Sequence, residues 1–134
     1  SLREICMVME KTILVVDDDP FYLDFFKQLF KKSNYAILTS NDGHFAYEIY
    51  QARQPDLVIT DVFMLSNGIE LLSRIKNDNK TTPVVIISGG LGKDNGYETL
   101  EMAKGLGADA CFHKPIEPAE IVDSVTSLLG NQAI

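Results

Sequence analysis

Short apolar runs alternate with amphipathic segments along the whole chain. Each apolar run has the length of one strand, and in each segment that follows, apolar residues recur every three or four positions, as on a helix with one buried face. The pattern predicts strands over residues 12–16, 35–39, 57–60, 84–88 and 110–113. It predicts helices over residues 21–32, 43–53, 69–77, 97–105 and 118–129.

Five such units predict an α/β fold. Because the strands are apolar on both faces and a helix follows each of them, they indicate a parallel sheet that is covered on both sides. Parallel strands of this kind are joined by right-handed crossovers. The expected fold is therefore a three-layer, doubly wound sheet of five parallel strands.

The first two helices carry start signals. Asp19 stands directly before Pro20, and Asp42 precedes the second helix, so both aspartates are expected to cap a helix. In the first helix, the expected apolar stripe contains Phe21, Phe25 and Gln28 or Leu29, with Leu23, Phe26 and Phe30 beside it. In the second helix it contains Phe45, Ala46, Ile49 and Tyr50.

Length and composition fit one globular domain. The chain has 134 residues, of which 46% are hydrophobic. We expect residues 1–10 to be an extension or a remnant of protein production and residues 11–134 to be the domain.

No apolar run reaches the roughly 18 residues that span a membrane, and no signal peptide is recognisable. Two cysteines fit a reduced, cytoplasmic protein better than a disulfide scaffold. The net charge of −7 argues against binding to nucleic acid.

Polar residues gather where the predicted strands end. The first strand runs into three acids, residues 17–19, the third ends at Asp61, the fourth at Ser88, and Lys114 follows the fifth. Ligands of open parallel sheets bind beyond the carboxyl ends of the strands, so these side chains should converge on one edge. Clustered carboxylates repel each other unless a cation lies between them, and oxygen ligands suit Mg²⁺. A single acid at a strand end would be no more than a turn or cap residue; the convergence favours a metal site.

Four sequence blocks resemble those of a response-regulator receiver domain of two-component signalling: "ILVVDDDP", "PDLVITDV", "PVVIISGG" and "KPI". They occur in the order of that family, and the resemblance covers roughly residues 11–130. It implies a flavodoxin-like fold with strand order 2-1-3-4-5. It also implies a switch that takes a phosphoryl group from a histidine kinase or a histidine phosphotransfer protein and then changes the conformation of the 88–114 face. Such a domain is not an enzyme beyond its own phosphorylation and dephosphorylation.

The resemblance assigns the chemistry to particular residues. Asp61 would be the phosphoacceptor, and Asp17, Asp18, Asp61 and the backbone carbonyl of Phe63 would hold Mg²⁺. Lys114 would pair with one phosphoryl oxygen.

The remaining family positions lie around the last two strands. Ser88 would bond to a second phosphoryl oxygen, and Gly89 would leave room for the group. The Lys114–Pro115 bond would be cis. The family's aromatic switch position holds Cys111, and Phe112 should face the other side of the sheet.

Three further departures from the family affect the expected behaviour. The loop after Asp61 has no proline and is one residue shorter than usual. The segment from Ser88 to Lys114 is longer than in compact receivers, with the excess in the glycine-rich residues 89–96. Neither Phe63 nor Gly90 offers a side-chain hydrogen bond to an attacking water, so we expect slow self-dephosphorylation.

Two other functions compete with the switch. A Mg²⁺-dependent phosphohydrolase of the haloacid-dehalogenase type also uses an aspartate at a strand end, but it places a second aspartate two residues later, where this chain has Phe63. A flavodoxin that binds flavin mononucleotide would need a hydroxyl-rich loop after the first strand, where this chain has three acids. We therefore expect a kinase or phosphotransfer protein as the partner, no membrane or nucleic acid, and at most a weak homodimer.

Overall fold

A computed structural model describes residues 10–62, 68–89 and 97–130, and in these ranges it forms one five-stranded parallel sheet. The strand order is β2-β1-β3-β4-β5, as the resemblance implies. The strands are β1 Thr12–Val16, β2 Ala36–Ser40, β3 Leu57–Asp61, β4 Val84–Ser88 and β5 Ala110–His113.

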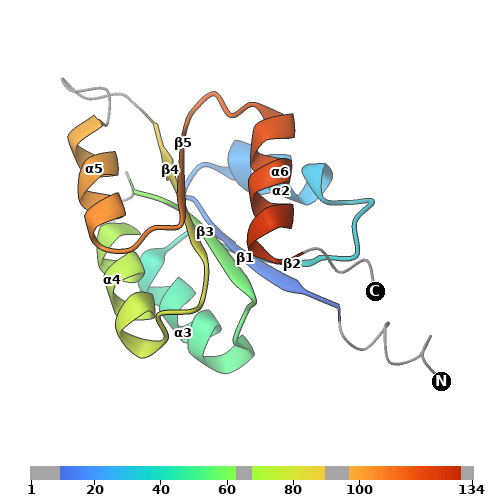
Figure 1. Cartoon of the computed structure of the whole chain (residues 1–134). Coiled ribbons are helices and arrows are strands. Elements are labelled where there is room, and N and C mark those ends of the chain that lie inside the picture. Colours follow the sequence, from blue (N-terminus) through green and yellow to red (C-terminus); the bar gives the residue numbers. More distant parts are fainter. Residues whose placement is uncertain (1–9, 63–67, 90–96, 131–134) are drawn as a thin grey trace.

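Helices cover both faces of the sheet, so the predicted three-layer, doubly wound fold is confirmed (Figure 1). The described helices are α2 Pro20–Leu29, α3 Gly43–Arg53, α4 Gly68–Asp78, α5 Tyr97–Gly105 and α6 Pro118–Leu128. Helices α2 and α6 pack on one face, and α3, α4 and α5 pack on the other. Among the described helices, none is both long and apolar enough to cross a membrane.

The strand alternation divides the core into two halves. In β1, Ile13 and Val15 face α2 and α6, whereas Leu14 and Val16 face α3, α4 and α5. All four side chains are buried, because successive side chains of a strand point to opposite faces and both faces are covered. The inner strands are therefore packed on both faces, and their carboxyl ends lie side by side at one edge of the sheet.

Both predicted aspartate caps are present. The Asp19 carboxylate accepts a hydrogen bond of 2.9 Å from the Phe21 amide, and Asp42 accepts one of 2.7 Å from the His44 amide. Helix α2 ends at Leu29, three residues before the predicted end, because Phe30 already has a non-helical backbone and its carbonyl accepts a 2.6 Å bond from the Ser33 hydroxyl.

The prediction that Phe21 and Phe45 lie on the buried sides of their helices is wrong. Phe21 is 65% exposed and Phe45 is 58% exposed. The buried aromatic side chains are Phe26 within α2 and Phe30 directly after it, four residues apart, so the face turned to the sheet is centred one step further round the helix. Periodicity alone allowed both stripes.

A contact with α4 explains which side of α3 faces the core. Tyr47 is buried against α4: its hydroxyl donates to Asp78, and the Arg74 guanidinium lies 3.8 Å from the centre of its ring. This contact draws the Tyr47 side of α3 inward. Phe45 is left on the outer side, where it lines a hollow of about 330 Å³ beside Leu38 of the edge strand.

Candidate functional site

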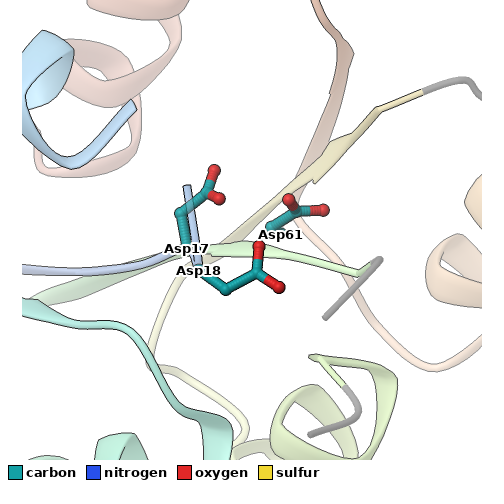
Figure 2. A group of neighbouring side chains, drawn as sticks. All are labelled: Asp17, Asp18 and Asp61. Carbon is teal, nitrogen blue, oxygen red and sulfur yellow. The ribbon is translucent and has the colours of Figure 1, made fainter. Parts of the chain in front are cut away.

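The structure brings the predicted acids together at the carboxyl edge of the sheet. Asp17 directly follows β1, and Asp61 is the last residue of the adjacent strand β3, whose Thr60 is in register with Val16. Carboxylate oxygens of Asp17, Asp18 and Asp61 lie within 4.8 Å of one another. Figure 2 shows the three side chains gathered where the two strands end, with Asp18 turned away from Asp17.

The three acids differ in their access to solvent. Asp17 and Asp61 are only 2% and 3% exposed, whereas Asp18 is exposed. Burial raises the pKa of Asp17 to about 6, although hydrogen bonds from Lys114 and the Asp19 amide oppose the shift. The neighbouring charge of Asp61 also contributes to this raised pKa, less than burial does. Two carboxylates are thus fixed within the protein, and the third forms the open side of the site.

Lys114 joins the two buried acids. Its ammonium lies 2.9 Å from Oδ2 of Asp17 and 2.8 Å from Oδ2 of Asp61, and its side chain is 14% exposed. Burial alone would lower the pKa of Lys114, but its hydrogen bonds to Asp61 and Asp17 outweigh burial and raise it. The lysine therefore remains charged at neutral pH.

The donor set fits a hard divalent cation. Three ionised carboxylates and one ammonium leave a charge of −2 on the cluster, which Mg²⁺ would balance. Oxygen-only ligands are those that Mg²⁺ prefers. The predicted fourth ligand, the Phe63 carbonyl, lies outside the described residues, as does Gly90.

Ser88 and Lys114 are held together by the backbone. Ser88 ends β4 and is fully buried, and its carbonyl accepts a 2.8 Å bond from the Lys114 amide. Gly89 follows it and is half-buried. The Lys114–Pro115 bond is cis, as the resemblance implies. The hydroxyl position, the glycine and the lysine thus lie along the same pair of strand ends, beside the acids.

The switch position has the predicted orientation. Cys111 packs on the α3, α4 and α5 side of the sheet, and Phe112 packs on the α2 and α6 side. Burial raises the pKa of the Cys111 thiol, so it stays neutral at physiological pH. At this position of β5, therefore, a cysteine stands where the family's aromatic switch residue would be.

Two residues at the site were missed by sequence reasoning. Gly68 begins α4 against the Asp61 carbonyl, and a Cβ at this position would lie 2.0 Å from the carbonyl oxygen. The ring centre of Tyr22 lies 4.3 Å from the Lys114 ammonium. A lone glycine seven residues after Asp61 was a usable signal, whereas nothing in the sequence singled out Tyr22 from the other aromatic residues of α2.

Comparison with known proteins points to one family. Residues 13–126 match the family model described as the response regulator receiver domain. The chain is 33% identical over 122 residues to the response regulator GtcR of Aneurinibacillus migulanus, covering 90% of this chain and 48% of that protein. It is 27% identical to the chemotaxis protein CheY of Halobacterium salinarum, covering 90% of this chain and 98% of that one.

Solved structures agree with the sequence matches. The receiver domain of the Francisella response regulator 1452 superposes with a TM-score of 0.76 at 28% identity, covering 89% of this chain and 96% of that chain. A receiver domain protein from Clostridium thermocellum shares the fold with a TM-score of 0.81 at 24% identity. The match covers 89% of this chain and 94% of that chain.

The matches also decide between the competing functions. They support a receiver and not a phosphohydrolase of the haloacid-dehalogenase type. The chain spans about half the length of the curated relatives first matched. With the family model covering most of the sequence and the fold and strand order in agreement, the chain belongs to the response regulator receiver domains, the phosphoacceptor signalling switches of two-component systems.

Proposed function

We propose that this receiver accepts a phosphoryl group on Asp61 in a Mg²⁺-dependent step. The observation that carries the proposal is the cluster of three acids within 4.8 Å, with Lys114 bridging Asp17 and Asp61. Asp61 is proposed as the acceptor because it is the last residue of β3, the position that matches the phosphoacceptor of the receiver family. Asp17, Asp18, Asp61 and the Phe63 carbonyl would hold the cation.

The transfer needs only one covalent exchange. A carboxylate oxygen of Asp61 attacks phosphorus, the bond from phosphorus to the donor breaks, and its electron pair leaves with the donor group, which is a histidine nitrogen when the donor is phosphohistidine. When bound by these residues, Mg²⁺ would supply charge stabilisation for the phosphoryl oxygens. Lys114 donates to the transferred group from the position in which it now bonds to Asp61.

Phosphorylation would change the conformation of the face formed by residues 88–114. Ser88 is fully buried at the end of β4, and bonding of its hydroxyl to a phosphoryl oxygen would draw this strand end toward Asp61, with Gly89 leaving room for the group. Because the Ser88 carbonyl is bonded to the Lys114 amide, movement of one strand end is passed to the other. Cys111 is too small to act as an aromatic switch, so the segment that follows Ser88 would carry the change.

The partners follow from this chemistry. Receiver domains of response regulators are phosphorylated by histidine kinases, and the chain also resembles a tenth of the histidine kinase P4 of Formosa agariphila, at 35% identity. We propose a histidine kinase or a histidine phosphotransfer protein as the donor, a cytoplasmic location, and no more than a weak homodimer. The domain would catalyse only its own phosphorylation and dephosphorylation. The acidic net charge of −7 argues against nucleic-acid binding by this domain.

Acetyl phosphate tests the proposal without a partner protein. Incubation with acetyl phosphate and Mg²⁺, followed by intact-mass measurement, should show one added phosphoryl group on the wild type. Asp61→Asn should gain none, and chelation of Mg²⁺ should abolish the gain. Steady release of inorganic phosphate over many turnovers, without a phosphorylated protein, would instead favour a hydrolase.

A further inference from the structure

Three groups surround the ammonium of Lys114. Two are the carboxylates of Asp17 and Asp61, at 2.9 and 2.8 Å. The third is the ring of Tyr22, whose centre lies 4.3 Å from Nζ. An ammonium has three N–H donors, and the negative face of an aromatic ring attracts a cation at this distance. The two carboxylates and the ring therefore contact the lysine ammonium on three sides.

We propose that Tyr22 is a positioning residue for Lys114, which it keeps over the site while the lysine changes partner from the Asp61 carboxylate to the phosphoryl group. This inference rests on the proposed function of Asp61. When an Asp61 oxygen becomes part of an acyl phosphate, the carboxylate loses its negative charge and its attraction for the ammonium weakens. The attraction of the Tyr22 ring does not change in that step.

Tyr22 is itself fixed by the loop that carries the acids. The amide of Asp19 donates a 2.9 Å bond to Asp17, and the Asp19 carboxylate caps α2 at Phe21. The Tyr22 ring then makes edge contacts with Phe21 and Phe25, at centroid distances of 5.0 and 5.7 Å. The short connection between β1 and α2 thus positions both Asp17, which binds the lysine, and the Tyr22 ring.

The contact with the Tyr22 ring would restrict the flexible side chain of Lys114. A lysine side chain has four flexible carbons and loses much rotamer freedom when its ammonium is held in one place. With Tyr22 replaced by an aliphatic residue, Lys114 would spend more time away from the transferred group whenever its bond to Asp61 is weakened. Phosphorylation should therefore slow even though every acid and the lysine remain.

A series at position 22 tests this. Tyr22→Phe keeps the ring, Tyr22→Leu removes it, and 3,4,5-trifluorophenylalanine at position 22 keeps the shape but weakens the negative face. Phe45→Leu, which removes an exposed aromatic ring from α3 on the other side of the sheet, is the control. The readouts are the rate of phosphorylation by acetyl phosphate with saturating Mg²⁺ and the NMR shift of the Lys114 Hε protons before phosphorylation.

We expect Tyr22→Phe and Phe45→Leu to stay within about twofold of the wild-type rate. Tyr22→Leu should be about tenfold slower, as expected for loss of a cation–π contact, and the trifluorinated ring should fall between them. The Lys114 Hε protons should lose an upfield ring-current shift in Tyr22→Leu. A wild-type rate in Tyr22→Leu, equal rates for the phenylalanine and trifluorinated forms, or unchanged Hε shifts would overturn the inference. Absence of phosphorylation in the wild type would instead reject the role of Asp61, while the Hε shift still decides whether Tyr22 holds the lysine.

Discussion

Gly68 packs directly on the backbone of Asp61: a Cβ at Gly68 would lie 2.0 Å from the Asp61 carbonyl oxygen. The start of α4 therefore approaches the proposed acceptor too closely for any side chain. We expect Gly68→Ala to lower the free energy of unfolding by about 3 kcal/mol, because the obstructing atom is backbone and the helix must shift as a whole. Urea unfolding measures this effect, and phosphorylation by acetyl phosphate should slow as well.

The chain provides a matched control for this substitution. Gly105 ends α5, and a Cβ added there would meet no atom within 4 Å. Gly105→Ala should leave the stability unchanged or raise it by up to about 1 kcal/mol. If the two alanine variants unfolded at the same urea concentration, the close approach of Gly68 to Asp61 would not be a constraint on the fold.

The buried carboxyl of Asp17 should make stability depend on pH when divalent cations are absent. Its pKa is raised from 3.8 in a solvated chain to about 6 in the folded protein, so the folded state binds the proton more tightly. The contribution of Asp17 to the free energy of unfolding is then greatest below about pH 4 and falls as the pH rises to about 6. The difference amounts to about 3 kcal/mol.

Asp17→Asn isolates this effect, since asparagine keeps the shape but does not titrate. Chelator-treated wild type and variant are compared by urea unfolding at several pH values between 4 and 8. Relative to the variant, the wild type should lose stability as the pH rises through this range. A stability difference that is constant with pH would show that Asp17 is not the titrating group.

Mg²⁺ should stabilise the protein through Asp18 but not through its neighbour Asp19. Asp18 contributes to the three-acid cluster, whereas Asp19 caps α2. Mg²⁺ should raise the melting temperature of the wild type, because a ligand that binds only the folded state stabilises it. Asp18→Asn should lose most of this response. Asp19→Ser removes a charge from the same run but keeps a capping side chain, so it should respond like the wild type. An equal response in Asp18→Asn and the wild type would remove Asp18 from the metal site.

The phosphoryl group should be long-lived. Phe63 and Gly90 lie two residues after Asp61 and Ser88, and neither side chain can orient an attacking water by a hydrogen bond. Without such orientation the hydrolysis rate is expected to be about 10²-fold lower. Decay of the phosphorylated protein after removal of the donor measures the lifetime, and Phe63→Asn should shorten it. A half-life of seconds in the wild type, or no change in the variant, would contradict this expectation.

Much of the fold and of the site could be predicted because both depend on where strands end. The apolar runs defined the strands, and parallel strands bring their last residues to one edge, so the sequence alone placed Asp17, Asp61 and Lys114 together. The exposure of Phe45 could not be predicted, because it depends on the contact of Tyr47 with α4. A helical period defines a face but not the neighbour to which that face turns.

The sequence could draw attention to Gly68, but the close contacts of Gly68 and Tyr22 themselves could not be predicted, for a similar reason. Each is a contact between separate elements, α4 with the end of β3 and α2 with the residue after β5. Such contacts depend on how closely the helices approach the sheet edge, to within an ångström or two. Residue type and spacing do not determine that distance.

The central claim is that Asp61 carries the phosphoryl group, and locating the modified residue tests it most directly. The protein is treated with acetyl phosphate and Mg²⁺, the acyl phosphate is reduced with borohydride, and the reduced residue is located by peptide mass spectrometry. Borohydride converts an aspartyl phosphate to homoserine, so a homoserine should appear at position 61 only in the sample that received both acetyl phosphate and Mg²⁺. Homoserine at position 17 or 18, or at none of the three acids, would contradict the account.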